Sequence, residues 1–220
     1  MPNYKIYYKR NLPHYQPPGY TFSVTFRLTD SLPLHIIKKL QAEKELKLNK
    51  INNIISKNEK LQSYLDYQQN YFEEFDNQLD RYLDSPKWLA DGRIASIVKE
   101  AIHYRDGKVY ELIAFTIMPN HAHIVFKPII KKIVGRTNCS TYIVTDILKS
   151  LKWYTAFNCN KILERTGAFW QHESYDHVVR NSDELERLVE YILYNPVKAR
   201  LCKNWEDWKW SYCNFSKMSL

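Results

Sequence analysis

Two histidines stand one residue apart inside an apolar run, in the stretch ELIAFTIMPNHAHIVFKP, residues 111–128. Alternate residues of a β-strand share a face, so His121 and His123 point the same way if this segment is extended. Two imidazoles on one face can hold one divalent ion, or bind a phosphate when they are protonated. The alternative is a pair of hydrogen-bonded histidines in a half-buried strand, because two ligands are too few for a metal site.

A second group with chemical potential is YILYN, in which Tyr191 and Asn195 are four residues apart. On a helix this spacing places both side chains on one face, about one turn apart. Tyr191 lies beside the apolar stripe of the expected helix, so its hydroxyl can reach a site at the helix flank. The alternative is a tyrosine at the core edge and an asparagine C-cap before Pro196. Arg187 shares the ridge and suits either a phosphate contact or a solvated surface.

Together the two groups form a complete set for cutting a phosphodiester. A metal held by the histidines and a side-chain carbonyl polarises the phosphate and offsets developing charge. A tyrosine oxygen attacks phosphorus, which leaves a covalent phosphotyrosine and a free 3′-OH. Because that bond keeps its energy for rejoining, strand transfer needs no ATP.

At these residues the sequence resembles a known family. MPNHAHIVF resembles the HUH motif (histidine, apolar residue, histidine) of the HUH endonuclease superfamily. WQHESYDHVVRNSDELERLVEYILYNPVKARL resembles the C-terminal block of REP-associated tyrosine transposases, relatives of the single-tyrosine transposases of small insertion sequences. The resemblance covers roughly residues 18–202 and is interrupted by a helical stretch at 34–83. An HUH motif alone has little specificity, but its combination with YDHVVR and YILYNPVKA, in that order, is specific.

The resemblance implies a role for each matching residue. His121 and His123 become the metal pair, Tyr191 the nucleophile, and Asn195 the polar residue that completes the metal site. A neutral carbonyl ligand suits Mg²⁺ or Mn²⁺ better than a structural zinc ion. Tyr194 is the rival nucleophile. The block at 175–177 (Tyr, Asp, His) matches the family and is expected to support the site structurally.

Composition agrees with a nucleic-acid partner. The 220-residue chain has a net charge of +8, a pI near 9.1, 17 tyrosines and 6 tryptophans. Lysine and arginine meet phosphates and aromatic rings stack on bases, although a basic protein with an aromatic core has the same composition. The four cysteines form no CxxC pair, which gives no sign of a zinc knuckle or redox motif. With neither a secretory h-region nor an apolar run of membrane-spanning length, we expect a cytoplasmic protein that is nucleoid-associated when bound to DNA.

The elements that must position these residues follow from the hydrophobic pattern. Alternation in YTFSVTFRL predicts a half-buried strand with Phe22, Val24 and Phe26 on one side. The other expected elements are one or two helices within 34–83 with a break near SKNEK, an amphipathic helix around 94–102, a hairpin of ELIAFTIM and HAHIVFKP, a helix at 140–165 with Trp153 among its apolar positions, and a helix capped by Asn181 that Pro196 ends.

We therefore predict an α+β fold with a ferredoxin-like central antiparallel sheet, helices packed on one face and the nucleophile helix beside the metal strand. The expected organisation is an irregular basic and aromatic arm (1–19), an HUH single-tyrosine transposase domain (20–202) with the helical insertion at about 34–83, and an aromatic basic tail (203–220). The expected activity is metal-dependent cleavage and strand transfer of single-stranded DNA near hairpins, by a monomer or homodimer. Candidate DNA contacts are Lys9, Arg10, Arg187, Trp205, Trp208 and Trp210.

Two other functions fit parts of the sequence. One is a DNA-binding regulatory protein that keeps the fold without transposition activity. The other is a histidine-nucleophile nucleotide hydrolase, which would want a third histidine at position 125, where this chain has Val125.

Overall fold

The structure, a computed structural model, describes residues 7–9, 13–82, 84–129 and 143–218. It contains two compact units, residues 1–29 with 87–220 and residues 30–86. Arg10, one of the expected DNA contacts, lies outside the described residues. None of the helices in the described ranges is both long and apolar enough to cross a membrane.

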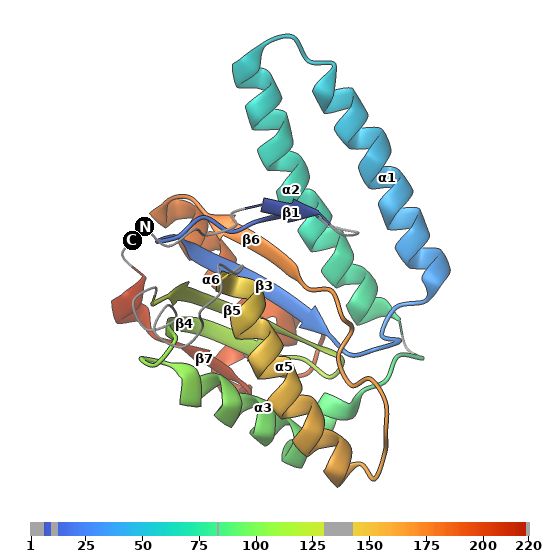
Figure 1. Cartoon of the computed structure of the whole chain (residues 1–220), viewed down its shortest axis with the longest axis vertical. Coiled ribbons are helices and arrows are strands. Elements are labelled where there is room, and N and C mark those ends of the chain that lie inside the picture. The colour runs from blue at the N-terminus through green and yellow to red at the C-terminus, as the bar shows by residue number, and fades with distance from the viewer. Residues whose placement is uncertain (1–6, 10–12, 83, 130–142, 219–220) are drawn as a thin grey trace. The chain divides into compact units, whose positions relative to one another are not determined.

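The larger unit is built on a five-stranded antiparallel sheet with the strand order β6-β3-β5-β4-β7 (Figure 1). Its strands are β3 (Thr21–Arg27), β4 (Tyr110–Ile117), β5 (His121–Pro128), β6 (Tyr175–Val179) and β7 (Ser211–Cys213). Its helices are α3 (Gly92–Arg105), α5 (Ile143–Ile162) and α6 (Ser182–Lys198), with short 3₁₀ turns at Trp88–Ala90, Trp205–Asp207 and Phe215–Lys217. The succession β3-α3-β4-β5-α5-β6 is the βαββαβ order of a ferredoxin-like fold, which confirms the predicted class. Strands β1 (Tyr7–Lys9) and β2 (Pro13–Tyr15) form a separate hairpin.

The two faces of the sheet are covered by different helices. Phe22, Ile124 and Phe126 share one cluster of buried residues with the inner side chains of α3 and α5. Val125, on the opposite side of β5, packs in a second cluster with the inner side chains of α6. Helices thus cover both faces rather than one, and α6 covers the face onto which His121 and His123 point.

Strand β3 differs from its prediction. Phe22, Val24 and Phe26 face the core as expected, but every residue of the strand is buried, including Ser23 and Thr25 on the opposite side. The alternating pattern indicates that one face of the strand is apolar and the other polar. It does not indicate whether other parts of the protein cover the polar face.

Helix α6 begins with a network of caps that ties it to β6. The Asn181 side chain accepts a hydrogen bond from the Glu184 N–H at 2.8 Å, as the capping-box pattern predicted. The Glu184 carboxylate accepts the Arg180 N–H at 2.8 Å and lies 2.9 Å from Nε2 of His177 on β6. Burial raises the pKa of Glu184, but the hydrogen bonds from His177 and from the Arg180 N–H outweigh it and leave this pKa below its ordinary value.

The other end of α6 corrects a prediction. The helix runs through Pro196 and ends at Lys198. A proline in the last turn removes a single N–H donor, and the chain closes the turn with bonds from the Ala199 N–H to the Asn195 carbonyl and from the Leu201 N–H to the Pro196 carbonyl.

Replacing Glu184 with alanine is expected to destabilise the larger unit by about 1–2 kcal/mol, because its carboxylate accepts the Arg180 N–H and links the helix to His177 on β6, whereas the Asn181 cap uses the backbone N–H and is kept. Since the folded pKa of Glu184 is lowered, this contribution is present at neutral pH and is lost as the pH falls through the folded pKa. Urea unfolding at pH 7 measures the cost. Glu186→Ala, on the exposed side of the same helix, is the control and should change stability by about 0.5 kcal/mol or less. Equal losses in both variants would show that the cap network contributes nothing of its own.

Helix α5 corrects a second prediction. Ile147, Leu148 and Leu151 are buried as expected, whereas the Trp153 side chain is 70% exposed. Trp153 follows Leu151 by two residues, or about 200° around the helix, which carries it out of the buried stripe.

Residues 30–86 form a helical unit of their own. Helices α1 (Leu34–Asn52) and α2 (Lys57–Arg81) pack together, and the break between them, at residues 53–56, lies next to the SKNEK stretch near which it was predicted. Ser56 caps α2 by accepting the Glu59 N–H.

Candidate active site

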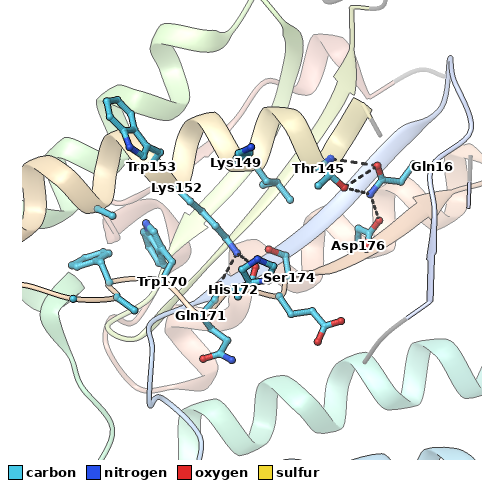
Figure 2. Close-up of a pocket in the computed structure, with 16 residues that line it drawn as sticks. Gln16, Thr145, Lys149, Lys152, Trp153, Trp170, Gln171, His172, Ser174 and Asp176 are labelled. Atoms are coloured by element: carbon cyan, nitrogen blue, oxygen red, sulfur yellow. Dashed lines mark hydrogen bonds between the residues drawn. The ribbon is translucent and has the colours of Figure 1, made fainter. Parts of the chain in front are cut away.

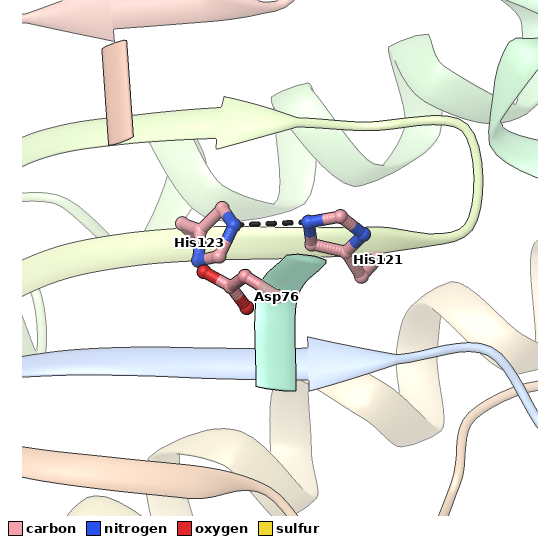
Figure 3. A group of neighbouring side chains, drawn as sticks. All are labelled: Asp76, His121 and His123. Atoms are coloured by element: carbon pink, nitrogen blue, oxygen red, sulfur yellow. Dashed lines mark hydrogen bonds between the residues drawn. The ribbon is translucent and has the colours of Figure 1, made fainter. Parts of the chain in front are cut away.

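His121 and His123 project from β5 on the same side, as the alternation predicted (Figure 3). Their Nε2 atoms lie 3.0 Å apart, and the two rings meet edge to face with centroids 4.7 Å apart. Both side chains are fully buried. Asp76, also drawn in Figure 3, belongs to the separate helical unit 30–86.

Hydrogen bonds on the far side of each ring determine which nitrogen carries the proton. Nδ1 of His121 lies 2.7 Å from Oδ1 of Asn120, an atom that can only accept, so this nitrogen donates and Nε2 keeps its lone pair. Nδ1 of His123 lies 2.8 Å from the Thr25 hydroxyl, and Nε2 lies 2.9 Å from Nδ2 of Asn195. With Nδ2 of Asn195 donating, Nε2 of His123 is also an acceptor. Two nitrogen lone pairs therefore converge at 3.0 Å, an arrangement that repels unless a cation or a proton is shared between them.

Burial favours the neutral form of both rings. It lowers the pKa of His121 to about 3. Burial, and then the charge that His121 would carry, lower the pKa of His123 well below its ordinary value. A neutral imidazole with a free lone pair is the form that binds a metal ion.

Asn195 completes the cluster from α6. Its side chain is buried. Asn195 is therefore not the surface C-cap that was the alternative reading of the sequence, and Ala199 is the C-cap of the helix. Oδ1 of Asn195 is a buried oxygen without a hydrogen-bond partner among the residues that the structure describes. An amide nitrogen and oxygen exchange by a half-turn of the side chain, so Asn195 can turn its oxygen toward an ion bound between the two rings.

This donor set fits the divalent ion expected from the sequence. Two neutral imidazole nitrogens face each other, and an amide oxygen that lacks a partner lies on a side chain that already touches one of them. The outer nitrogens of both rings are held by Asn120 and Thr25, which is the usual support for metal-ligating histidines. A carbonyl oxygen in the set favours a hard ion such as Mg²⁺ or Mn²⁺.

Tyr191 lies one helical turn before Asn195 on α6, and its ring packs at the edge of the cluster of buried residues under that helix. The ammonium of Lys198 lies 5.2 Å from the centre of the Tyr191 ring, so a positive charge lies close to this side chain. Tyr194, the rival nucleophile, is 51% exposed.

The remaining predicted residues lie elsewhere in the fold. Arg187 is exposed on α6, and Lys9 belongs to β1. Trp205 and Trp208 are half-buried, with the Trp205 ring against Phe215 and the Trp208 N–H donating to the Ile117 carbonyl. Trp210 is only 8% exposed and packs in the core. These three rings offer little free surface on which a base could stack.

Sequence reasoning missed the residues that orient the histidines. Asn120 immediately precedes His121, so a polar side chain at this position could have been recognised as a hydrogen-bond partner for the ring. Thr25 stands 98 residues from His123, and only the β3–β5 register, which pairs these two residues, brings them together.

Comparisons with known proteins bear on the fold and on the family that the sequence resembles. No family model matches the chain. A protein of Haemophilus influenzae that carries the name REP-associated tyrosine transposase is 28% identical over 103 residues. The match takes in 46% of this chain and 58% of the relative, so the chain spans little more than half the length of that protein. A solved structure of a REP-associated tyrosine transposase bound to a REP hairpin superposes with a TM-score of 0.50 at 16% identity, over 93% of this chain and 80% of that one, which supports the same fold.

Proposed function

We propose that this chain is a metal-dependent single-stranded DNA endonuclease and strand transferase that cleaves near DNA hairpins through a 5′-phosphotyrosine intermediate. One observation carries the proposal: the Nε2 atoms of His121 and His123 lie within hydrogen-bond distance of each other, and the Asn195 side chain lies within that distance of His123. Asn195 belongs to α6, and Tyr191 lies one turn before it on the same helix. The names of the relative and of the solved structure point to the same activity and to a hairpin substrate.

Each residue then has a defined task. His121, His123 and Asn195 would hold Mg²⁺ or Mn²⁺, which when bound withdraws charge from a phosphate oxygen. The Tyr191 oxygen loses its proton and forms a bond to phosphorus, while the bond from phosphorus to the 3′-oxygen breaks. That oxygen takes up a proton and leaves as a 3′-OH, and the 5′-phosphate stays on the tyrosine. Attack by another 3′-OH reverses the step and joins a new strand.

The fold supplies the rigidity that this chemistry needs. The histidines lie on the central strand of the sheet, and the nucleophile lies on a helix that is anchored to β6 through Glu184 and His177. Both histidine rings are held by second hydrogen bonds, so the ligand atoms are oriented before any substrate arrives.

The direct test is to incubate the protein with labelled hairpin DNA and Mn²⁺ and to look for a protein–DNA adduct that resists SDS. An adduct and a new 3′-OH end are expected. DNA binding without an adduct would identify the protein as a DNA-binding regulator that keeps the fold without the chemistry.

Binding of DNA is expected to depend steeply on salt, because the chain carries a net charge of +8. The logarithm of the affinity should fall linearly with the logarithm of the salt concentration, with a slope of about −0.7 for each phosphate contacted on a single strand. Arg187→Ala should make the slope less negative by about that amount if this exposed arginine contacts a phosphate. A salt response near zero would mean that the basic residues are only a solvated surface.

A further inference from the structure

Helix α5 displays large aromatic side chains on its outer surface. Trp153 is 70% exposed and Phe157 is 65% exposed, and their rings lie nearly parallel at 14°, with centroids 6.1 Å apart. Lys149 stands one turn before Trp153 and is exposed as well. Aromatic rings that are solvent-exposed and flanked by lysine are suited to stacking on bases whose phosphates meet the cation.

A cavity of about 480 Å³ opens beside this surface, between α5 and residues 167–176 (Figure 2). Trp153 and Ala156 line it from the helix, and Trp170 lines it from the opposite segment. This volume is within the range of sites that take small organic molecules. The cavity lies on the side of the sheet that α5 covers, whereas the histidines face α6.

Polar groups inside the cavity suit a neutral ring with hydrogen-bond acceptors. Nζ of Lys152 donates to the carbonyls of Gln171 and His172 at 2.9 and 3.2 Å, which leaves one of its three protons for a ligand. Burial, and then the charge of Arg27, lower the pKa of Lys152 to about 7. The third proton is present only in the charged form, and an acceptor bound beside the amine would favour that form. At the other end, Gln16 donates to the Asp176 carboxylate at 2.7 Å.

The carboxylates of Glu173 and Asp176 also line the cavity and would repel a bare phosphate. A nucleobase is uncharged and planar, and it carries the acceptors that Lys152 can meet. Its phosphates would remain outside, near Lys149 on the rim. These charges favour a base within the cavity and the sugar–phosphate backbone along the helix.

We propose that α5 and the 167–176 segment form a binding site for the unpaired strand that flanks a hairpin, with bases stacked on Trp153 and Phe157 and one base inserted into the cavity. The site rests on the proposed function, because it assumes a single-stranded DNA substrate. It would hold the flanking strand on the opposite side of the sheet from the histidines.

The test is to measure binding of the full chain to a fluorescent DNA hairpin with a short oligothymidine flank, and to the same hairpin without a flank. Trp153→Ala should weaken binding of the flanked hairpin about 5- to 150-fold, the range for the loss of one stacked base, and should leave the blunt hairpin unchanged. Ala156→Met, which places a larger side chain in the cavity, should give a loss of the same kind. Tyr104→Ala removes a ring that is 67% exposed on α3 and should have no effect on either probe.

Several results would overturn the site. Equal affinity of wild type and Trp153→Ala for the flanked hairpin would exclude stacking on α5, and an unchanged affinity of Ala156→Met would exclude a base in the cavity. Equal loss for both hairpins would indicate general damage, which melting temperatures of the two variants would reveal. Because these measurements follow binding alone, a flank-specific loss in a protein that forms no adduct would support this site and reject the proposed chemistry.

Discussion

Replacing Tyr191 with phenylalanine is expected to reduce the covalent protein–DNA adduct to background, a loss of roughly 10⁴-fold or more on the scale of nucleophile deletions. The change removes one oxygen and keeps the ring, which packs at the edge of the cluster of buried residues under α6. Folding stability should therefore fall by less than about 1.5 kcal/mol, and hairpin binding should stay within a few-fold of wild type. Adduct yield, melting temperature and affinity are measured on the same preparations.

Tyr194→Phe is the matched control, because Tyr194 lies on the same helix and is 51% exposed. It should form the adduct at the wild-type level. A normal adduct in Tyr191→Phe together with a lost adduct in Tyr194→Phe would transfer the nucleophile to position 194. If both single variants form the adduct, the helix does not supply the nucleophile at all.

The local part of this site could be predicted from the sequence. His121 and His123 share a face because a strand has a period of two, and Tyr191 and Asn195 share a face because a helix has a period near four. Both relations involve residues close together in the chain, so the backbone geometry of one element determines them. The ferredoxin-like sheet, expected once the family resemblance was in view, is also present in the structure.

Relations between distant elements could not be predicted in this way. The polar side of β3 is buried as well, and no residue within the strand indicates this, because the covering groups come from other parts of the chain. The Thr25 hydroxyl meets His123 through strand register, and no pattern within either strand reports the pairing. A sequence motif therefore identified the two candidate ligand histidines, while the residues that hold their rings became visible only in the folded sheet.

Trp153 shows the opposite limitation. An apolar residue near a buried stripe is assigned to the core by type, but its angle around the helix places it outside. For Trp210 the difference is reversed, because this candidate DNA contact is buried in the core. Residue type gave the chemistry in both cases, and packing decided which rings remain accessible.

Alanine at His121 or at His123 is expected to remove stabilisation by Mn²⁺ as well as cleavage. For the wild type, Mn²⁺ at one hundred times its dissociation constant should add about 2.7 kcal/mol, because binding to the folded state alone shifts the folding equilibrium. For a unit of this size that gain corresponds to a rise in melting temperature of roughly 5–10 °C. Either variant should show a shift close to zero.

Stability without metal cannot separate a ligand from a structural histidine here. Both rings are buried and hydrogen-bonded, so His123→Ala leaves the Thr25 hydroxyl and the Asn195 amide without the imidazole, at roughly 1–3 kcal/mol. A cost of this size is expected whether or not the ring binds an ion. The response to Mn²⁺ is the informative quantity, because a structural role alone does not create one.

His103→Ala provides the matched control. His103 is a half-buried histidine on α3 that packs against Phe115 and Tyr212, with ring centroids 5.2 and 4.8 Å away. Its loss should lower the melting temperature while the Mn²⁺ shift stays at the wild-type size. Asn195→Ala should keep a reduced shift, because water can replace a carbonyl ligand. A full Mn²⁺ shift in both His121→Ala and His123→Ala would place the ion elsewhere, and the convergence of the two Nε2 atoms would then be a shared proton in a buried histidine pair.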